Sequence, residues 1–78
     1  MQQKSIVYSQ PNCQACNAVK ALLGMHGFEV EERIIDGIKW NKSDLFEAVP
    51  NARSVPQVLI NGELIGGLTD VSKFLQPR

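Results

Sequence analysis

The chain has 78 residues, a length that fits a single domain spanning residues 1–78. Eight basic residues balance eight acidic ones without a Lys/Arg stripe, which makes nucleic acid a poor candidate for a partner. No apolar run approaches the roughly 20 residues needed to cross a bilayer, and no secretory signal is recognisable, so we expect a cytoplasmic protein outside the membrane.

The first third of the chain predicts a strand, a turn and a helix. Residues 4–9 are rich in β-branched and aromatic side chains, which indicates a strand, and residues 10–12 indicate a turn. From Cys13 to about His26 the apolar residues recur at helical spacing, and Gly27 supplies the stop. The residues expected on the inner face of this helix are Cys16, Val19, Leu22, Leu23 and Met25.

The middle of the chain predicts an edge strand and a short helix. Apolar residues alternate with charges over residues 28–35, and charged outer positions suit the edge of a sheet because they discourage pairing with other chains. A helix is expected at about residues 42–49, with Asn41 or Ser43 as its cap. The residues expected to face inward are Phe28, Val30 and Ile34 on the strand and Leu45, Phe46 and Val49 on the helix.

The clearest local pattern is a hairpin. Asn61-Gly62 stands between two apolar runs, residues 56–60 and 63–65. An Asn-Gly pair in this setting favours a two-residue turn in which both turn residues take positive φ.

A last helix is expected from about Thr69 to Leu75, with Thr69 or Asp70 as its cap and Pro77 after it. Its inner face would carry Leu68, Val71, Phe74 and Leu75. The resulting order is β-α-β-α-β-β-α, an α/β fold with a mixed four-stranded sheet flanked by three helices on both faces. The first βαβ unit is expected to be right-handed and parallel.

The only two cysteines, Cys13 and Cys16, lie at the junction between the predicted first strand and the predicted first helix. A disulfide between them closes a loop too short to stabilise the fold much, so the pair has another purpose. At a helix N-terminus the dipole and the free N–H groups stabilise a thiolate, which favours Cys13 as a nucleophile. Cys16, one turn further in, would resolve the mixed disulfide that Cys13 forms.

The competing interpretation of two cysteines three apart is half of a zinc site. Zinc needs four ligands, and the next soft ligand, His26, lies about 15 Å further along the helix. We therefore expect no metal site, and a redox function is favoured.

Three segments resemble glutaredoxins and together cover nearly the whole chain. They are Tyr8–Cys16, Ala52–Gly62 and Ile65–Asp70. The resemblance implies a thioredoxin fold, glutathione as the reducing co-substrate and no tightly bound cofactor. It also implies a cis Val55-Pro56 peptide whose Val55 backbone pairs with the cysteinyl part of glutathione.

The same resemblance implies a set of glutathione-binding residues. Arg53 would contact the glycine carboxylate, and the start of the last helix would hold the γ-glutamyl end, which also suits an anion on physical grounds. The full set expected to bind glutathione or substrate is Gln10, Arg53, Ser54, Val55, Pro56, Gly67, Leu68, Thr69 and Asp70.

The chain departs from the family pattern around its cysteines. The usual CPYC is CQAC here, and Gln10 stands where a lysine is common. We therefore expect Cys13 to be less acidic, and glutathione to be held less tightly, than in typical members. Leu68 replaces a frequent cysteine with little expected consequence.

The sequence thus predicts a monomeric dithiol glutaredoxin that reduces protein disulfides and glutathione mixed disulfides, with ribonucleotide reductase as a client suggested by resemblance. One alternative is a redoxin served by thioredoxin reductase. Another is a [2Fe–2S] carrier that holds its cluster through Cys13 and glutathione, which Gln14 leaves open because the residue after the first cysteine is not proline.

Overall fold

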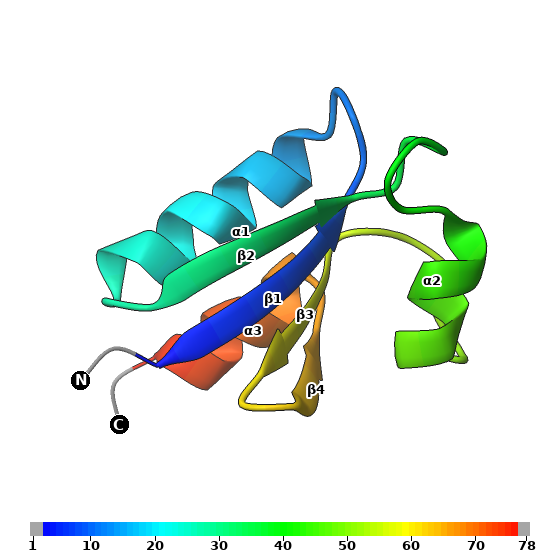
Figure 1. The fold of residues 1–78 in the computed structure, drawn as a ribbon. Helices are drawn as coiled ribbons and strands as arrows, with labels where there is room; N and C mark the ends of the chain where they lie inside the picture. Colours follow the sequence, from blue (N-terminus) through cyan, green and yellow to red (C-terminus); the bar gives the residue numbers. More distant parts are fainter. Residues whose placement is uncertain (1–2, 77–78) are drawn as a thin grey trace.

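The computed structural model describes residues 3–76 and contains the expected order of elements (Figure 1). The predicted β-α-β-α-β-β-α succession is confirmed, and Pro77 lies outside the described residues. The elements are β1 (Lys4–Ser9), α1 (Gln14–Met25), β2 (Glu29–Ile34), α2 (Lys42–Ala48), β3 (Gln57–Ile60), β4 (Glu63–Gly66) and α3 (Leu68–Leu75).

The four strands form one mixed sheet in the order β2-β1-β3-β4. β1 pairs with β2 in parallel, whereas β1 with β3 and β3 with β4 are antiparallel. The charged strand β2 is therefore an edge strand, as its sequence predicts. In the parallel register Val7 is paired with Glu32, and Ser9 is paired with Ile34. Paired residues, and residues two apart on one strand, project to the same side of a sheet. Glu32 therefore lies on the same side of the sheet as Val7 and Ser9.

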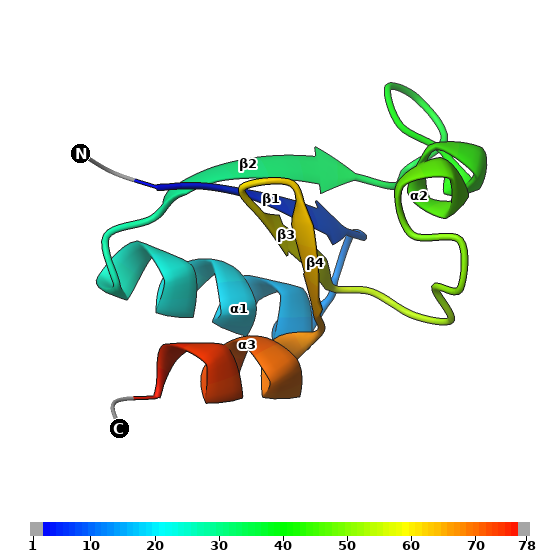
Figure 2. The same ribbon diagram turned by 90° about the horizontal axis from the view of Figure 1, so that it is seen from below.

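Each face of the sheet has its own apolar cluster, as the alternation of side chains along β1 requires. α1 and α3 run side by side over one face (Figure 2), where Val7 contacts a cluster that includes Leu23 and Val71. On the other face Tyr8 packs with Leu45 of α2 and with Val49, the residue that caps this helix at its C-terminus. The prediction of helices on both faces is confirmed.

The hairpin turn between β3 and β4 forms as predicted. Asn61 and Gly62 have φ of 53° and 81°, the positive values that a two-residue turn of this type requires. Asn41 caps α2 through a reciprocal pair of hydrogen bonds with Asp44, so of the two predicted caps Asn41 is the correct one.

The prediction that Thr69 or Asp70 is the N-cap of α3 is wrong. Gly67 takes the N-cap position, and the helix begins at Leu68. Asp70 occupies the third helical position, from which its carboxylate accepts a hydrogen bond from the Gly67 N–H at 3.3 Å. Asp70 thus completes the cap from inside the helix, as the acidic member of a capping box does.

Some side chains expected inside lie largely in solvent. Phe46 is 46% exposed and Phe74 is 51% exposed. Each flanks its helix's apolar stripe, because Leu45 and Val49 on α2, and Leu68, Val71 and Leu75 on α3, already fill the positions that face the sheet. Ile34 and Met25 lie at the ends of β2 and α1, where no neighbour covers them fully, and are 36% and 82% exposed.

Among residues 3–76, none of the helices is both long enough and apolar enough to span a membrane.

Candidate active site

Cys13 is the N-cap residue of α1. It has extended backbone angles, and its Sγ accepts a hydrogen bond from the backbone N–H of Cys16 at 3.1 Å. No acidic residue stands in the first turn of the helix to offset the partial positive charge of its free N–H groups. The sulfur therefore lies where a helix stabilises negative charge best, which is the placement expected from the sequence.

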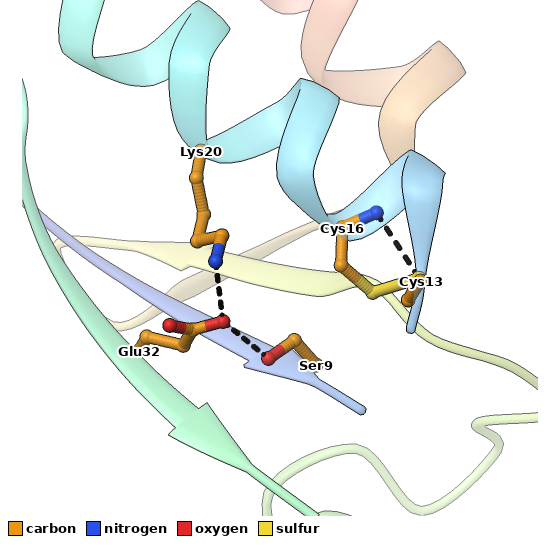
Figure 3. Close-up of polar contacts among 5 residues, drawn as sticks. All are labelled: Ser9, Cys13, Cys16, Lys20 and Glu32. Atoms are coloured by element: carbon orange, nitrogen blue, oxygen red, sulfur yellow. Dashed lines mark hydrogen bonds and ion pairs between the residues drawn. A yellow bond between two sulfur atoms is a disulfide. The ribbon is translucent and has the colours of Figure 1, made fainter. Parts of the chain in front are cut away.

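Cys13 and Cys16 are joined by a disulfide, with their Cα atoms 5.2 Å apart (Figure 3). The structure is thus the oxidised form of a redox-competent pair. Cys13 is half-buried, whereas Cys16 is only 1% exposed. Cys13 is therefore open to an incoming sulfur, whereas Cys16 is shielded from solvent.

The segment before β3 packs against the start of α3. The Val55-Pro56 peptide bond is cis, as the family resemblance implies, and Pro56 is buried. A Cβ built on Gly67 would lie 3.3 Å from the Pro56 carbonyl oxygen, tighter than most such contacts. Gly67 therefore lets the α3 N-terminus approach the cis-proline segment closely, and a larger residue would separate the two.

Four of the predicted binding residues meet in one groove: Gln10, Arg53, Ser54 and Val55. The groove continues over α2, which contributes Lys42, Leu45 and Phe46, with Ile35 and Ala52 completing the wall.

The other predicted binding residues, Gly67 to Asp70, do not line this groove. They lie at the N-terminus of α3 and connect to the groove through the contact of Gly67 with Pro56. The predicted set therefore falls into two neighbouring parts, one on each side of the cis-proline segment.

Sequence reasoning missed the contribution of α2 to the groove. Lys42 was assigned no role and Phe46 was expected in the core, whereas both line the groove. The spacing of apolar residues on α2 could have revealed this. Leu45 and Val49, four residues apart, already form a narrow stripe that faces the sheet, so Phe46 lies beside that stripe.

A polar cluster that the sequence did not reveal lies between α1 and the sheet. Oε2 of Glu32 accepts hydrogen bonds from Lys20 Nζ and from Ser9 Oγ, both at 2.7 Å. The Lys20 hydrogen bond, which outweighs the opposing effect of burial, together with the Ser9 hydroxyl lowers the pKa of Glu32 below 4.5. Ser9 is fully buried, and this carboxylate satisfies its hydroxyl.

Tyr8 and Trp40 lie on the opposite face of the sheet. The Arg33 guanidinium stacks over the Trp40 ring at 4.6 Å and donates a hydrogen bond to the Tyr8 hydroxyl at 2.8 Å. These contacts anchor the loop that leads into α2 and so help to set one wall of the groove.

Within the part of the chain that the structure describes, no three His, Cys, Asp or Glu side chains come together to hold a metal ion.

The half-buried Cys13 stands at a helix N-cap and is disulfide-bonded to a buried cysteine one turn further along the helix. Together with the β-α-β-α-β-β-α fold, this pair is typical of a thiol–disulfide oxidoreductase of the thioredoxin-like class. Residues 6–65 match the family model of glutaredoxins. The chain therefore belongs to the glutaredoxin family, and it is a dithiol oxidoreductase with a CxxC redox pair.

Individual relatives agree with this assignment. Glutaredoxin 3 of Escherichia coli is 31% identical over 65 residues, which cover 83% of this chain and 77% of that protein. The hybrid peroxiredoxin hyPrx5 of Haemophilus influenzae is 34% identical over 74 residues, 95% of this chain but 30% of that protein. The crystal structure of a buckwheat glutaredoxin–glutathione complex matches with a TM-score of 0.75 and 27% identity, covering 91% of this chain and 66% of that one.

Proposed function

We propose that the protein reduces glutathione mixed disulfides and protein disulfides at the expense of glutathione. The observation that carries the proposal is the contrast between the two sulfurs: Cys13 is accessible at a helix N-cap, and Cys16 is buried one turn behind it. A thiol stabilised as thiolate and open to solvent is suited to attack, and a shielded neighbour is suited to the intramolecular second step.

In the two-thiol reaction the Cys13 thiolate attacks one sulfur of a substrate disulfide. The substrate S–S bond breaks, a Cys13–substrate disulfide forms, and the other substrate sulfur leaves as a thiolate that takes up a proton. The Cys16 thiolate then attacks Cys13 Sγ, which releases the second substrate thiol and forms the Cys13–Cys16 disulfide, the state of this structure. Two molecules of glutathione return the pair to dithiols and leave as glutathione disulfide.

In the one-thiol reaction Cys13 attacks the glutathione sulfur of a glutathionylated protein. The protein thiol leaves, and a Cys13–glutathione disulfide remains. A second glutathione thiolate attacks the sulfur of the bound glutathione, which restores the Cys13 thiolate and releases glutathione disulfide. Cys16 takes no part in this sequence.

Three features support glutathione as the reductant. Arg53 lies in the groove beside Val55 and offers a cation for the glycine carboxylate. The backbone of Val55, before a cis-proline, suits pairing with an extended peptide. The α3 N-terminus, with Leu68 and Thr69 in its first turn, offers free N–H groups for the γ-glutamyl carboxylate, and Asp70 offers a counter-charge for its amine.

The test is turnover of a glutathionylated protein by the parent, Cys13→Ser and Cys16→Ser, with glutathione and glutathione reductase. We expect Cys13→Ser to be inactive and Cys16→Ser to keep the one-thiol reaction. A parallel assay with thioredoxin reductase in place of glutathione is expected to give no turnover. Full activity of Cys13→Ser, or turnover with thioredoxin reductase only, would overturn the proposal.

A peroxiredoxin is a specific candidate for the protein substrate. Nearly all of this chain matches part of a protein named as a hybrid peroxiredoxin, whose remaining length this chain does not cover. Joining the two parts in one polypeptide is expected to help when one reduces the other. The test measures glutathione-dependent peroxide turnover by a peroxiredoxin with this protein, without it, and with its Cys13→Ser variant as the control. We expect the parent protein to increase the turnover rate. A rate no higher than with Cys13→Ser would exclude a peroxiredoxin as a substrate.

A further inference from the structure

Reduction of a protein disulfide depends on Cys16, because in the proposed function this buried thiol must lose its proton before it can attack. A thiol that is 1% exposed is deprived of the water that stabilises a thiolate. The charges nearest to it inside the protein therefore matter more than they would at the surface.

Only one pair of charges lies beneath the active-site end of α1 in the described residues. Lys20 is one helical turn beyond Cys16, and in Figure 3 both side chains project from the same side of the helix toward the sheet. Residues four apart on a helix are direct neighbours. Lys20 meets Glu32 of β2 there at 2.7 Å, and each side chain is only 28% exposed.

The other charged groups of the surrounding elements point elsewhere. Glu31 and Arg33 pair with each other on the opposite face of β2, and Asp70 caps α3. The remaining charged residues on these elements are exposed: Lys4 on β1, Glu29 on β2 and Lys73 on α3.

We propose that Glu32 is a positioning residue that cancels the charge of Lys20 beside Cys16, and so keeps the resolving thiol protonated while Cys13 carries the thiolate. Ser9, whose buried hydroxyl donates to the same carboxylate oxygen, fixes Glu32 in this place from β1. The pair adds no net charge to the interior, so the only strong stabilisation of a thiolate is at Cys13, at the helix N-terminus. The inference rests on the proposed roles of the two cysteines.

This arrangement predicts opposite effects for its two members. In Glu32→Gln an uncompensated ammonium remains beside Cys16 and stabilises its thiolate. In Lys20→Met an uncompensated carboxylate remains and opposes it. A purely structural ion pair predicts no such difference in sign, since breaking it from either side only loosens the contact between α1 and β2.

The experiment follows the ultraviolet absorbance of the Cys16 thiolate against pH, with Cys16 as the lone thiol in a Cys13→Ser background. We expect Glu32→Gln to raise the thiolate fraction of Cys16 at a given pH by about threefold to tenfold and Lys20→Met to lower it by a similar factor. The double variant is expected to return near the parent. Glu31→Gln is the matched control, because it breaks the ion pair on the other face of β2 and should leave Cys16 unchanged.

Shifts of the same sign in the two single variants, or shifts no larger than that of Glu31→Gln, would overturn the proposal. Each single variant is decisive alone, because its sign is fixed in advance, so failure of one to fold leaves the other as the test. The readout needs no turnover and no glutathione. Its failure is therefore distinct from failure of the proposed function, which the coupled assay measures.

Discussion

The backbone N–H of Cys16 points at Sγ of Cys13 and donates a hydrogen bond to it over 3.1 Å. Cys13 thus does for α1 what a serine or aspartate does at other helix starts, with sulfur as the acceptor. When the disulfide is reduced, the same N–H can stabilise a Cys13 thiolate, because a hydrogen bond to the charged form favours ionisation. The helix cap and the reactive group are the same atom.

This relationship predicts that Cys13 reacts as a thiolate at neutral pH even though Gln10 supplies no charge. In a Cys16→Ser background, at pH values below the pKa of Cys13, we expect Gln10→Lys to raise the thiolate fraction of Cys13 by roughly threefold, the effect of one partly exposed cation. Gln10→Met, of similar size and uncharged, is the control and should change nothing. Alkylation rate against pH measures both, and equal profiles for the lysine and methionine variants would show that position 10 does not act on Cys13.

Arg53 is predicted to serve glutathione binding and not the chemistry of sulfur exchange. It is exposed and lines the groove beside Val55. Removing its charge in Arg53→Met should raise KM for glutathione by about fivefold and leave kcat within about twofold, as loss of one exposed charge-assisted contact would. Lys73→Met, an exposed cation in the last turn of α3, is the matched control. A fall in kcat at unchanged KM would contradict this assignment.

The sequence was most informative where local chemistry decides the structure. Asn61-Gly62 predicted the hairpin because few residue pairs tolerate two positive φ angles, and the Cys13–Cys16 spacing at a strand-to-helix junction predicted the redox centre. The cis Val55-Pro56 bond followed only from the family resemblance, since proline alone favours the trans form.

Features that depend on tertiary contacts were not predictable in this way. The Gly67 cap is set by the close approach of α3 to Pro56, a contact between segments that the sequence does not place together. Glu32 shares the parity of Val30 and Ile34, which were expected to face inward, but nothing in the sequence pairs it with Lys20 of α1. Phe46 has the composition of a core residue but stands beside the inward stripe of α2, in the groove wall.

Gly66 and Gly24 are predicted to respond in opposite ways to a methyl group. Gly66 has a φ of 123°, and an added Cβ would lie 2.9 Å from Cγ of Asp70. Gly66→Ala should therefore displace the carboxylate that caps α3. We expect this to lower the free energy of unfolding by about 1–3 kcal/mol. Gly24 lies in α1 with nothing within 4 Å of such a Cβ. Gly24→Ala should therefore raise the free energy of unfolding by roughly 0.5–1 kcal/mol.

Urea unfolding at neutral pH compares the two glycine variants. If Gly66→Ala were as stable as the parent, the position of the Asp70 carboxylate at the start of α3 would not matter for stability. In that case its cap on Gly67 contributes little.

Glu32 is predicted to make the stability of the fold sensitive to acid. Its pKa is lowered in the folded protein, mainly because Lys20 donates a hydrogen bond to it, with Ser9 adding to the effect. A carboxyl group with a lowered folded pKa stabilises the fold above its unfolded pKa, and this contribution is lost as pH falls through the folded value.

The free energy of unfolding of the parent should therefore exceed that of Glu32→Gln at neutral pH, and the difference should shrink as pH falls below 4.5, the ordinary value for this carboxyl. Urea titrations of both proteins over a pH series measure the difference directly, and Glu31→Gln, whose carboxylate is more exposed, is the control. A difference that stays constant down to the acid limit, or one that grows, would mean that Glu32 is not held as an ionised partner of Lys20 and Ser9. The electrostatic role proposed for it beside Cys16 would then lose its basis as well.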